Sequence, residues 1–138
     1  MLESIQDFFL FKGQYGNVSI AKAMPEKLTS HAMVAINDTA CLVTGGWRTY
    51  GKISKLTYIY DIEHMVWEFG PMMNNAREGH GSTILVDRTT TTALTFVVVA
   101  GGWNGYKRMA SVEMLQLPYH ENKWKIGESF YLTDTYRI

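Results

Sequence analysis

The chain has 138 residues, of which 46% are hydrophobic and 19% are charged, and its formal net charge is zero. This balance is typical of a folded globular chain and excludes an intrinsically disordered one. Because no basic block is present, there is no electrostatic reason to expect nucleic acid as a partner, and we expect none.

Signals for a compartment are sparse. The longest uninterrupted apolar run, residues 96–100, is far shorter than the roughly 20 residues of a membrane span, so we expect no membrane contact. The single cysteine, Cys41, excludes an internal disulfide, and its apolar surroundings favour a buried side chain over a reactive thiol. We expect a cytoplasmic protein, although sequons at Asn17 and Asn37 leave secretion open.

The first part of the chain is ambiguous. Residues 2–11 carry large apolar side chains at helical spacing and are equally compatible with a strand. Residues 16–23 are a candidate outer strand of a structural unit that precedes the rest.

Further along, short runs rich in β-branched and aromatic residues alternate with turn-forming breaks, which predicts four strands in each half. No window of helical length shows a convincing apolar stripe. The strands predicted in the first half are residues 31–36, 40–43, 56–61 and 65–69, and those in the second half are residues 81–86, 94–100, 111–117 and 123–128.

The two halves repeat one pattern. Gly45-Gly46-Trp47 follows an apolar run in the first half, and Gly101-Gly102-Trp103 follows another one in the second half. Matched prolines, histidines and tryptophans recur at similar but unequal steps. The steps differ because the second half has extra residues around 87–92, in a predicted hairpin where added length costs little. A period of about 50 residues is typical of solenoids, propellers and other repeat proteins.

Matching residues occur in the same order in both halves. They are Met24, Pro25, His31, Gly45, Gly46, Tyr60, Asp61 and Trp67 in the first half, and Pro71, Met72, Arg77, His80, Gly101, Gly102 and Trp124 in the second. Over residues 24–128 this pattern resembles the kelch repeat. The resemblance implies an all-β fold made of kelch-type β-propeller blades, each a four-stranded antiparallel sheet.

The resemblance also implies a division of the chain. Residues 24–70 would be one blade and residues 71–128 a second one. Residues 1–23 would be a partial preceding blade or an extension, and residues 129–138 the start of a further blade or a tail. Since propellers typically use about four to eight blades, about two leave the ring incomplete. Either the chain is a fragment of a longer protein that supplies the missing blades, or copies of it associate.

The halves also differ. Aligned from the glycines, Tyr60 meets Gln116, so the second half lacks the expected tyrosine and turn aspartate. The first half has only Lys27 near the position of Arg77. By resemblance, Arg77 and His80 tie one blade to the next, and the tryptophans fill the space between sheets.

Three connections form the candidate binding surface for a partner. In kelch proteins the second-to-third strand loops, here 47–52 and 103–108, often bind partners together with the connection 72–76. Aromatic and arginine side chains dominate binding hot spots, and basic groups suit an acidic peptide. Alternatively, the aromatic residues only shield the sheets and the basic ones are only solvated. The candidates are Trp47, Arg48, Tyr50, Lys52, Asn75, Trp103, Asn104, Tyr106, Lys107 and Arg108.

We expect no catalytic residues, no metal site and no cofactor. The four histidines, His31, His64, His80 and His120, show no metal-ligand spacing. Asp61 is expected to shape a turn rather than to act as an acid or base.

The favoured function is therefore a non-catalytic module that binds another protein or an acidic peptide segment. Kelch proteins of this kind are substrate adaptors of ubiquitin ligases or scaffolds on actin. A second hypothesis is a structural unit that closes a propeller ring with copies of itself. A third is a fragment of a copper radical oxidase, but Cys41 lies too deep in an apolar strand to serve obviously in its tyrosine–cysteine pair.

Overall fold

The computed structural model describes residues 9–12, 17–119 and 122–127. This part of the chain is all-β, and its strands pair only in antiparallel fashion. A long apolar helix of the kind that crosses a membrane does not occur in it.

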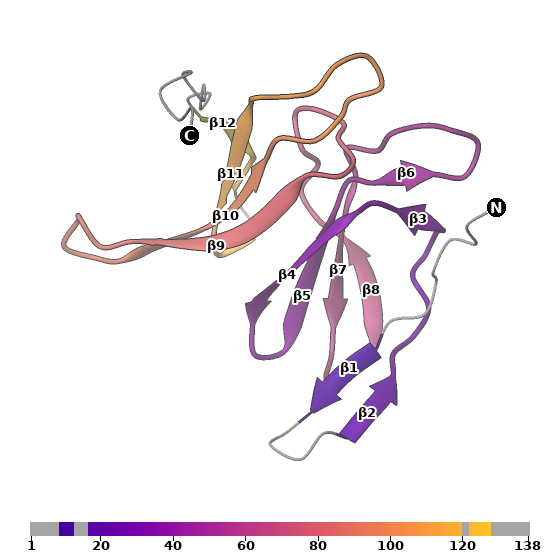
Figure 1. Ribbon diagram of the computed structural model, residues 1–138. Coiled ribbons are helices and arrows are strands. Elements are labelled where there is room, and N and C mark those ends of the chain that lie inside the picture. Colours follow the sequence, from indigo (N-terminus) through magenta and orange to yellow (C-terminus); the bar gives the residue numbers. More distant parts are fainter. Residues whose placement is uncertain (1–8, 13–16, 120–121, 128–138) are drawn as a thin grey trace, which may run out of the picture.

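The strands of the described residues form two large sheets and two small ones (Figure 1). They are β1 (Phe9–Lys12), β2 (Asn17–Ile20), β3 (Leu28–Thr29), β4 (Ala32–Asn37), β5 (Ala40–Thr44), β6 (Trp47–Arg48), β7 (Thr57–Asp61), β8 (Val66–Phe69), β9 (Gly81–Asp87), β10 (Leu94–Ala100), β11 (Val112–Gln116) and β12 (Lys125–Ile126). The first sheet has the order β4-β5-β7-β8, and the second sheet has the order β9-β10-β11-β12. The small sheets are the hairpin β1-β2 and the pair β3-β6.

The strands predicted from the sequence correspond to those of the two large sheets, mostly within one or two positions. The prediction for 123–128 was too long, since β12 covers only Lys125–Ile126 and residue 128 lies outside the described part. Of the ambiguous residues 2–11, residues 9–11 lie in the strand β1, and residues 2–8 lie outside the described part. Within 16–23, β2 pairs with β1 as a hairpin.

Cross-strand pairing shows that the two large sheets follow one plan. Thr44 lies opposite Thr57, and Ala100 lies opposite Val112, while Thr44 and Ala100 each directly precede a Gly-Gly pair. The alignment of the third strands made from the sequence was therefore wrong by a single position: Tyr60 corresponds to Leu115. The cause is the connection between the second and third strands, which spans 45–56 in the first unit and the slightly shorter range 101–111 in the second.

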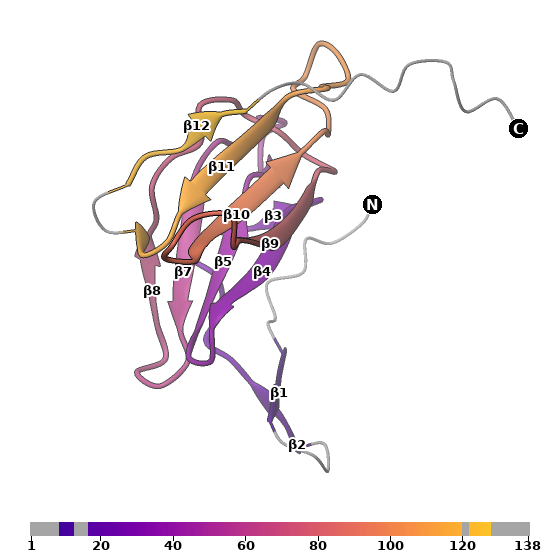
Figure 2. The same cartoon turned by 90° about the vertical axis from the view of Figure 1, so that its left-hand side faces the viewer.

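The two large sheets pack face to face, and Figure 2 shows the second sheet lying in front of the first. Their shared core contains Leu42 and Ile59 from the first sheet and Val97, Val99 and Leu115 from the second. The last three have no exposed surface. Burying each such side chain contributes about 1.5–3 kcal/mol, so this interface is a main source of stability.

The opposite face of the first sheet is covered by the segment that leads into it, residues 21–29. Met24 and Leu28 of this lead-in segment pack on Val43 and Tyr58. Ala21 packs on Cys41 beside Tyr60. The expectation of a buried Cys41 is confirmed, and burial raises the pKa of its thiol, which keeps it protonated and unreactive.

The outer face of the second sheet is more open. Phe96, Val98 and Met114 lie there and are only partly buried. By strand register, Val98 and Met114 correspond to Leu42 and Ile59, which are buried between the sheets. Within the described residues the second sheet therefore lacks a layer that the first sheet has.

Candidate functional site

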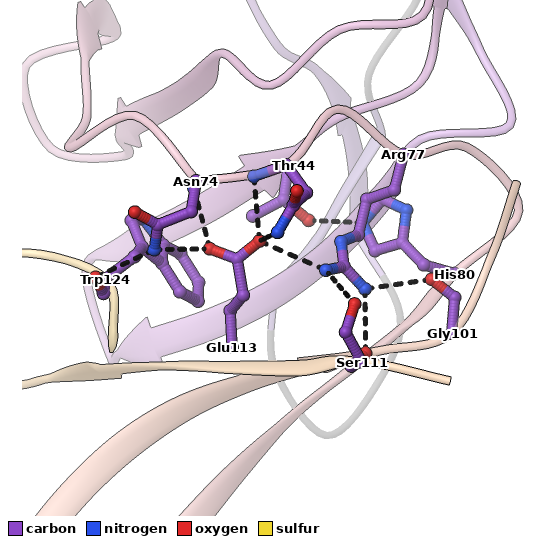
Figure 3. Close-up of polar contacts among 9 residues, drawn as sticks. Thr44, Asn74, Arg77, His80, Gly101, Ser111, Glu113 and Trp124 are labelled. Atoms are coloured by element: carbon purple, nitrogen blue, oxygen red, sulfur yellow. Dashed lines mark hydrogen bonds and ion pairs between the residues drawn. The ribbon is translucent and has the colours of Figure 1, made fainter. Parts of the chain in front are cut away.

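The connection between the two large sheets carries a buried ion pair (Figure 3). Arg77 lies in the lead-in segment of the second sheet, residues 70–78, and its Nη2 is 3.1 Å from Oε1 of Glu113 on β11. Both side chains are fully buried. The guanidinium also donates hydrogen bonds to the carbonyl oxygens of Gly101 and Ser111, at 2.9 and 3.1 Å. Arg77 thus holds the lead-in segment against β10 and β11.

The carboxylate of Glu113 is also bound by the lead-in segment. The backbone N–H groups of Asn74 and Asn75 donate to it at 2.7 and 2.9 Å, and the Asn74 amide donates at 3.0 Å. Burial alone would raise the pKa of Glu113, but these hydrogen bonds and the one from Arg77 lower the pKa overall. Glu113 is therefore ionised. The side-chain amide of Asn75 also faces this carboxylate, at 3.3 Å, so it belongs to the junction between the sheets and is not presented with the two loops.

His80 links the two sheets directly. Its Nε2 lies 2.8 Å from Oγ1 of Thr44 on β5. Burial, reinforced by the positive charge of Arg77, lowers the pKa of His80 to about 4. The ring is neutral at pH 7, and its buried Nδ1 has no hydrogen-bond partner among the described residues. The corresponding His31 is also partly buried, and burial lowers its pKa as well.

The glycine pairs sit where the units meet. Gly45 has a φ of +59°, and a Cβ there would overlap the carbonyl oxygen of Arg77. Gly46 donates its N–H to that same oxygen at 2.9 Å. At Gly101 the φ is +71°, but the nearest atom to a Cβ would be 3.7 Å away, on Met109. The space occupied at Gly45 by the following unit is therefore open at Gly101.

Each of the two repeated tryptophans anchors the lead-in segment of its own sheet. The Trp67 indole N–H donates to the carbonyl oxygen of Lys22 at 2.9 Å, and its ring packs on Tyr60 at a centroid distance of 4.7 Å. The Trp124 indole N–H donates to the carbonyl oxygen of Pro71 at 2.6 Å. Trp124 is buried in the core between the sheets, whereas Trp67 is half-buried.

The two predicted binding loops lie at the same end of the large sheets (Figure 1). Trp47 pairs with Thr29, and Trp103 pairs in the same way with Glu78, so each loop begins on a short backbone ladder. A Cβ at Gly105 would lie 3.6 Å from Cδ1 of Ile53, the residue that follows loop 47–52, so loop 103–108 lies close to the end of the first loop.

The loop tips are well formed and carry exposed aromatic rings. Tyr50 is 96% exposed and Tyr106 is 90% exposed. Asn104 Oδ1 accepts the N–H groups of Tyr106 and Lys107, both at 2.9 Å, so this residue shapes the turn. Tyr50 has a φ of +75°, and Gly51 donates its N–H to the carbonyl oxygen of Arg48.

The basic residues of the loops fall into two groups. Arg48 is engaged, because its Nε lies 2.6 Å from Oε2 of Glu26, which also accepts a hydrogen bond from the Tyr58 hydroxyl. The pKa of Tyr58 is raised mainly by burial and further by its hydrogen bond to Glu26. The exposed residues Lys52, Lys107 and Arg108 take part in none of the ion pairs of the described chain. The sequence reasoning did not single out Glu26, which lies far from Arg48 in the chain.

An open pocket of about 330 Å³ lies beside the loop 103–108. Its walls include Ser30, Glu78, Trp103, Arg108 and Met109, and glycine backbone lines the rest. The pocket therefore lies between the ends of the two lead-in segments and loop 103–108, and it makes this end of the molecule concave.

The remaining predicted polar residues have local roles. The turn role expected for Asp61 is confirmed, since its Oδ1 accepts the N–H groups of Glu63 and His64 and its Oδ2 lies 2.7 Å from the His64 ring. His120 lies outside the described residues. In the described ranges no group of three or more histidine, cysteine or acidic side chains is arranged to hold a metal ion.

Neither the protein-family models nor the curated proteins give a significant match to this chain.

Proposed function

We propose that this chain is a non-catalytic protein-interaction module made of two kelch-type propeller blades, and that it binds an acidic segment of a partner through loops 47–52 and 103–108. The observation that carries this proposal is the pair of exposed tyrosines, Tyr50 and Tyr106, at equivalent places on two ordered loops. Tyrosine presents a large ring with a polar tip at little cost in entropy, which suits a binding surface.

The charges of the loops define the partner. Lys52, Lys107 and Arg108 are exposed and have no ion pair in the described part of the chain, whereas Arg48 is held by Glu26. An acidic segment supplies carboxylates for charge-assisted hydrogen bonds with these free basic groups. Tyr50 and Tyr106 would pack against the apolar side chains of the same segment.

The blade assignment is supported by equivalent contacts in the two units. Gly70 donates its N–H to the carbonyl oxygen of Thr57, and Gly127 does the same to Val112 at the corresponding place. The open space at Gly101 and the open outer face of the second sheet leave room for a further blade, which a longer protein or a second copy would supply. A ubiquitin-ligase adaptor, an actin scaffold and a cytoplasmic location stay predictions.

The test uses a short fluorescein-labelled peptide in which glutamates alternate with leucine and tyrosine, followed by fluorescence anisotropy. We expect binding that weakens with salt and that is lost when glutamine replaces every glutamate. The double variant K107A/R108A should bind at least about tenfold more weakly, because it loses two charge-assisted contacts. The matched control is R88A, which removes an exposed basic residue on the β9–β10 hairpin, away from the loops (Figure 1).

The result that would overturn the proposal is equal binding of the glutamate and glutamine peptides, or no binding of either. Equal loss in K107A/R108A and R88A would show a general charge effect and would also reject the loops as the site.

A further inference from the structure

Each large sheet has two edge strands, and three of these four edges are protected against pairing with another chain. β8 has four residues and carries Glu68, and β12 has only two residues and carries Lys125. β4 has a shift of register between Ala35 and Asn37, which interrupts its edge. Short length, charge and bulges are the means by which β-proteins prevent edge-to-edge association.

The fourth edge, β9, lacks these protections over most of its length, since only its last residue, Asp87, is charged. It has seven residues and pairs with β10 from Gly81 to Asp87 without a shift of register. Between Gly81 and Val86 there is no charged residue and no proline. Two successive apolar side chains, Leu85 and Val86, are 46% and 41% exposed. Figure 1 shows the outer end of the β9–β10 hairpin projecting to the left of the rest of the molecule.

We propose that the outer half of β9 pairs with the same strand of a second copy, antiparallel and about a two-fold axis near Leu85. In this register Ile84 lies opposite Val86 of the second copy, and Thr83 lies opposite Asp87 of the second copy. No like charges meet, and apolar β-branched residues face each other, which favours pairing. The formal net charge of zero adds no long-range repulsion between copies.

Such a contact joins two four-stranded sheets into one continuous sheet. A two-fold contact is self-complementary and closed, so it yields a dimer and not an open polymer. It differs from a ring of blades, in which sheets pack face to face. The hairpin lies away from loops 47–52 and 103–108, so the dimer does not depend on the proposed function (Figure 1). If both hold, the dimer presents two loop faces and binds a partner with two acidic segments more tightly than a monomer does.

The experiment measures the molar mass of the full chain by light scattering on a sizing column over a range of loading concentrations. We expect a concentration-dependent dimer for the natural chain. L85K and L85E each place like charges near the two-fold axis and should weaken the dimer at least about tenfold. An equimolar mixture of the two variants should restore the dimer, because opposite charges then meet across the axis.

The control is V66K, which places the same charge on the protected edge strand β8 at a residue with matched exposure, 45%. It should dimerise like the natural chain. The restored dimer in the mixture also shows that both variants are folded, and far-UV circular dichroism of each variant checks this separately.

A natural chain that stays monomeric at every concentration would overturn this inference. So would an oligomer that survives in both L85K and L85E, since the copies would then associate through another surface, such as the outer face of the second sheet.

Discussion

In the first sheet Leu28 packs against Val43 and Tyr58, whereas at the corresponding place in the second sheet Arg77 pairs with Glu113. The correspondence follows from the ladders, because Tyr58 lies opposite Val43 as Glu113 lies opposite Val99. The same kind of structural unit can therefore hold its lead-in segment with an apolar contact or with an ion pair, provided that both partners are present.

A further polar contact of the lead-in segment also differs between the two sheets. The Tyr58 hydroxyl donates to Glu26 of the first lead-in segment, while Glu113 accepts from Asn75 of the second one. In the first unit the sheet residue donates and the lead-in residue accepts, and in the second unit the lead-in residue donates and the sheet residue accepts. We infer that the requirement at this place is a matched set of contacts and not a particular residue.

The largest effect is expected when one half of the second sheet's pair is removed. R77L should destabilise the fold by about 3–5 kcal/mol, because it leaves Glu113 buried and without its counter-charge. The double variant R77L/E113Y gives the second sheet the first sheet's residues at these two places and should recover at least about 2 kcal/mol of that loss. Urea unfolding followed by tryptophan fluorescence measures both changes. A double variant less stable than R77L would contradict the equivalence of the two places.

Trp124 and Trp67 allow a second comparison. W124A should cost about 4 kcal/mol, because it opens a cavity in the core between the sheets. W67A should cost less, about 2–3 kcal/mol, since Trp67 is only half-buried. Thermal unfolding followed by far-UV circular dichroism ranks the two variants. Equal midpoints for W67A and the natural chain would show that Trp67 is not part of a core.

The first glycine of each pair should tolerate alanine differently, because only Gly45 faces a neighbouring unit. G45A should cost about 3 kcal/mol, because an alanine there adopts a left-handed backbone and also overlaps the Arg77 carbonyl. G101A should cost only about 1–2 kcal/mol, from the backbone alone. Urea midpoints distinguish these values. Similar losses at both positions would mean that Gly101, too, faces a packed neighbour in solution.

The smallest effect is a dependence on pH. Because the pKa of His80 is about 4 in the folded chain and lies near 6.5 in an unfolded one, only the unfolded chain binds a proton between these values. Stability should therefore fall as the pH drops from 6.5 to about 4, by about 2 kcal/mol, since solvent partly screens the ring. H80Q should flatten this part of the curve. An unchanged slope in H80Q would assign the acid sensitivity to another group.

Much of this architecture is readable in the sequence. The apolar runs that end in Gly-Gly, and the turn residues between them, predict the strands of the two large sheets within one or two positions in most cases. Equivalent loops then follow from the repeat, and with them the places of Tyr50 and Tyr106. These features are predictable because each depends on neighbouring residues.

Long-range pairing was not predictable in the same way. Glu113 stands between the apolar residues Val112 and Met114, and nothing near it in the sequence indicates that Arg77 neutralises it. The β3-β6 pair consists of two residues on each side, too few for a pattern. Alignment on the glycines misplaced the third strand by a single position, because a loop can lose a residue without a local signal.

The measurement that tests the central claim most directly is hydrogen exchange of backbone amides, followed by NMR on the intact chain. The claim is that the two sheets are successive copies of one unit packed on each other. Gly46 donates its N–H to Arg77, and Gly79 donates its N–H to Ser30 at 2.8 Å, and both bonds join the two units. We predict that these two amides exchange as slowly as those of β10. Fast exchange at Gly46 and Gly79, with slow exchange inside each sheet, would contradict the account.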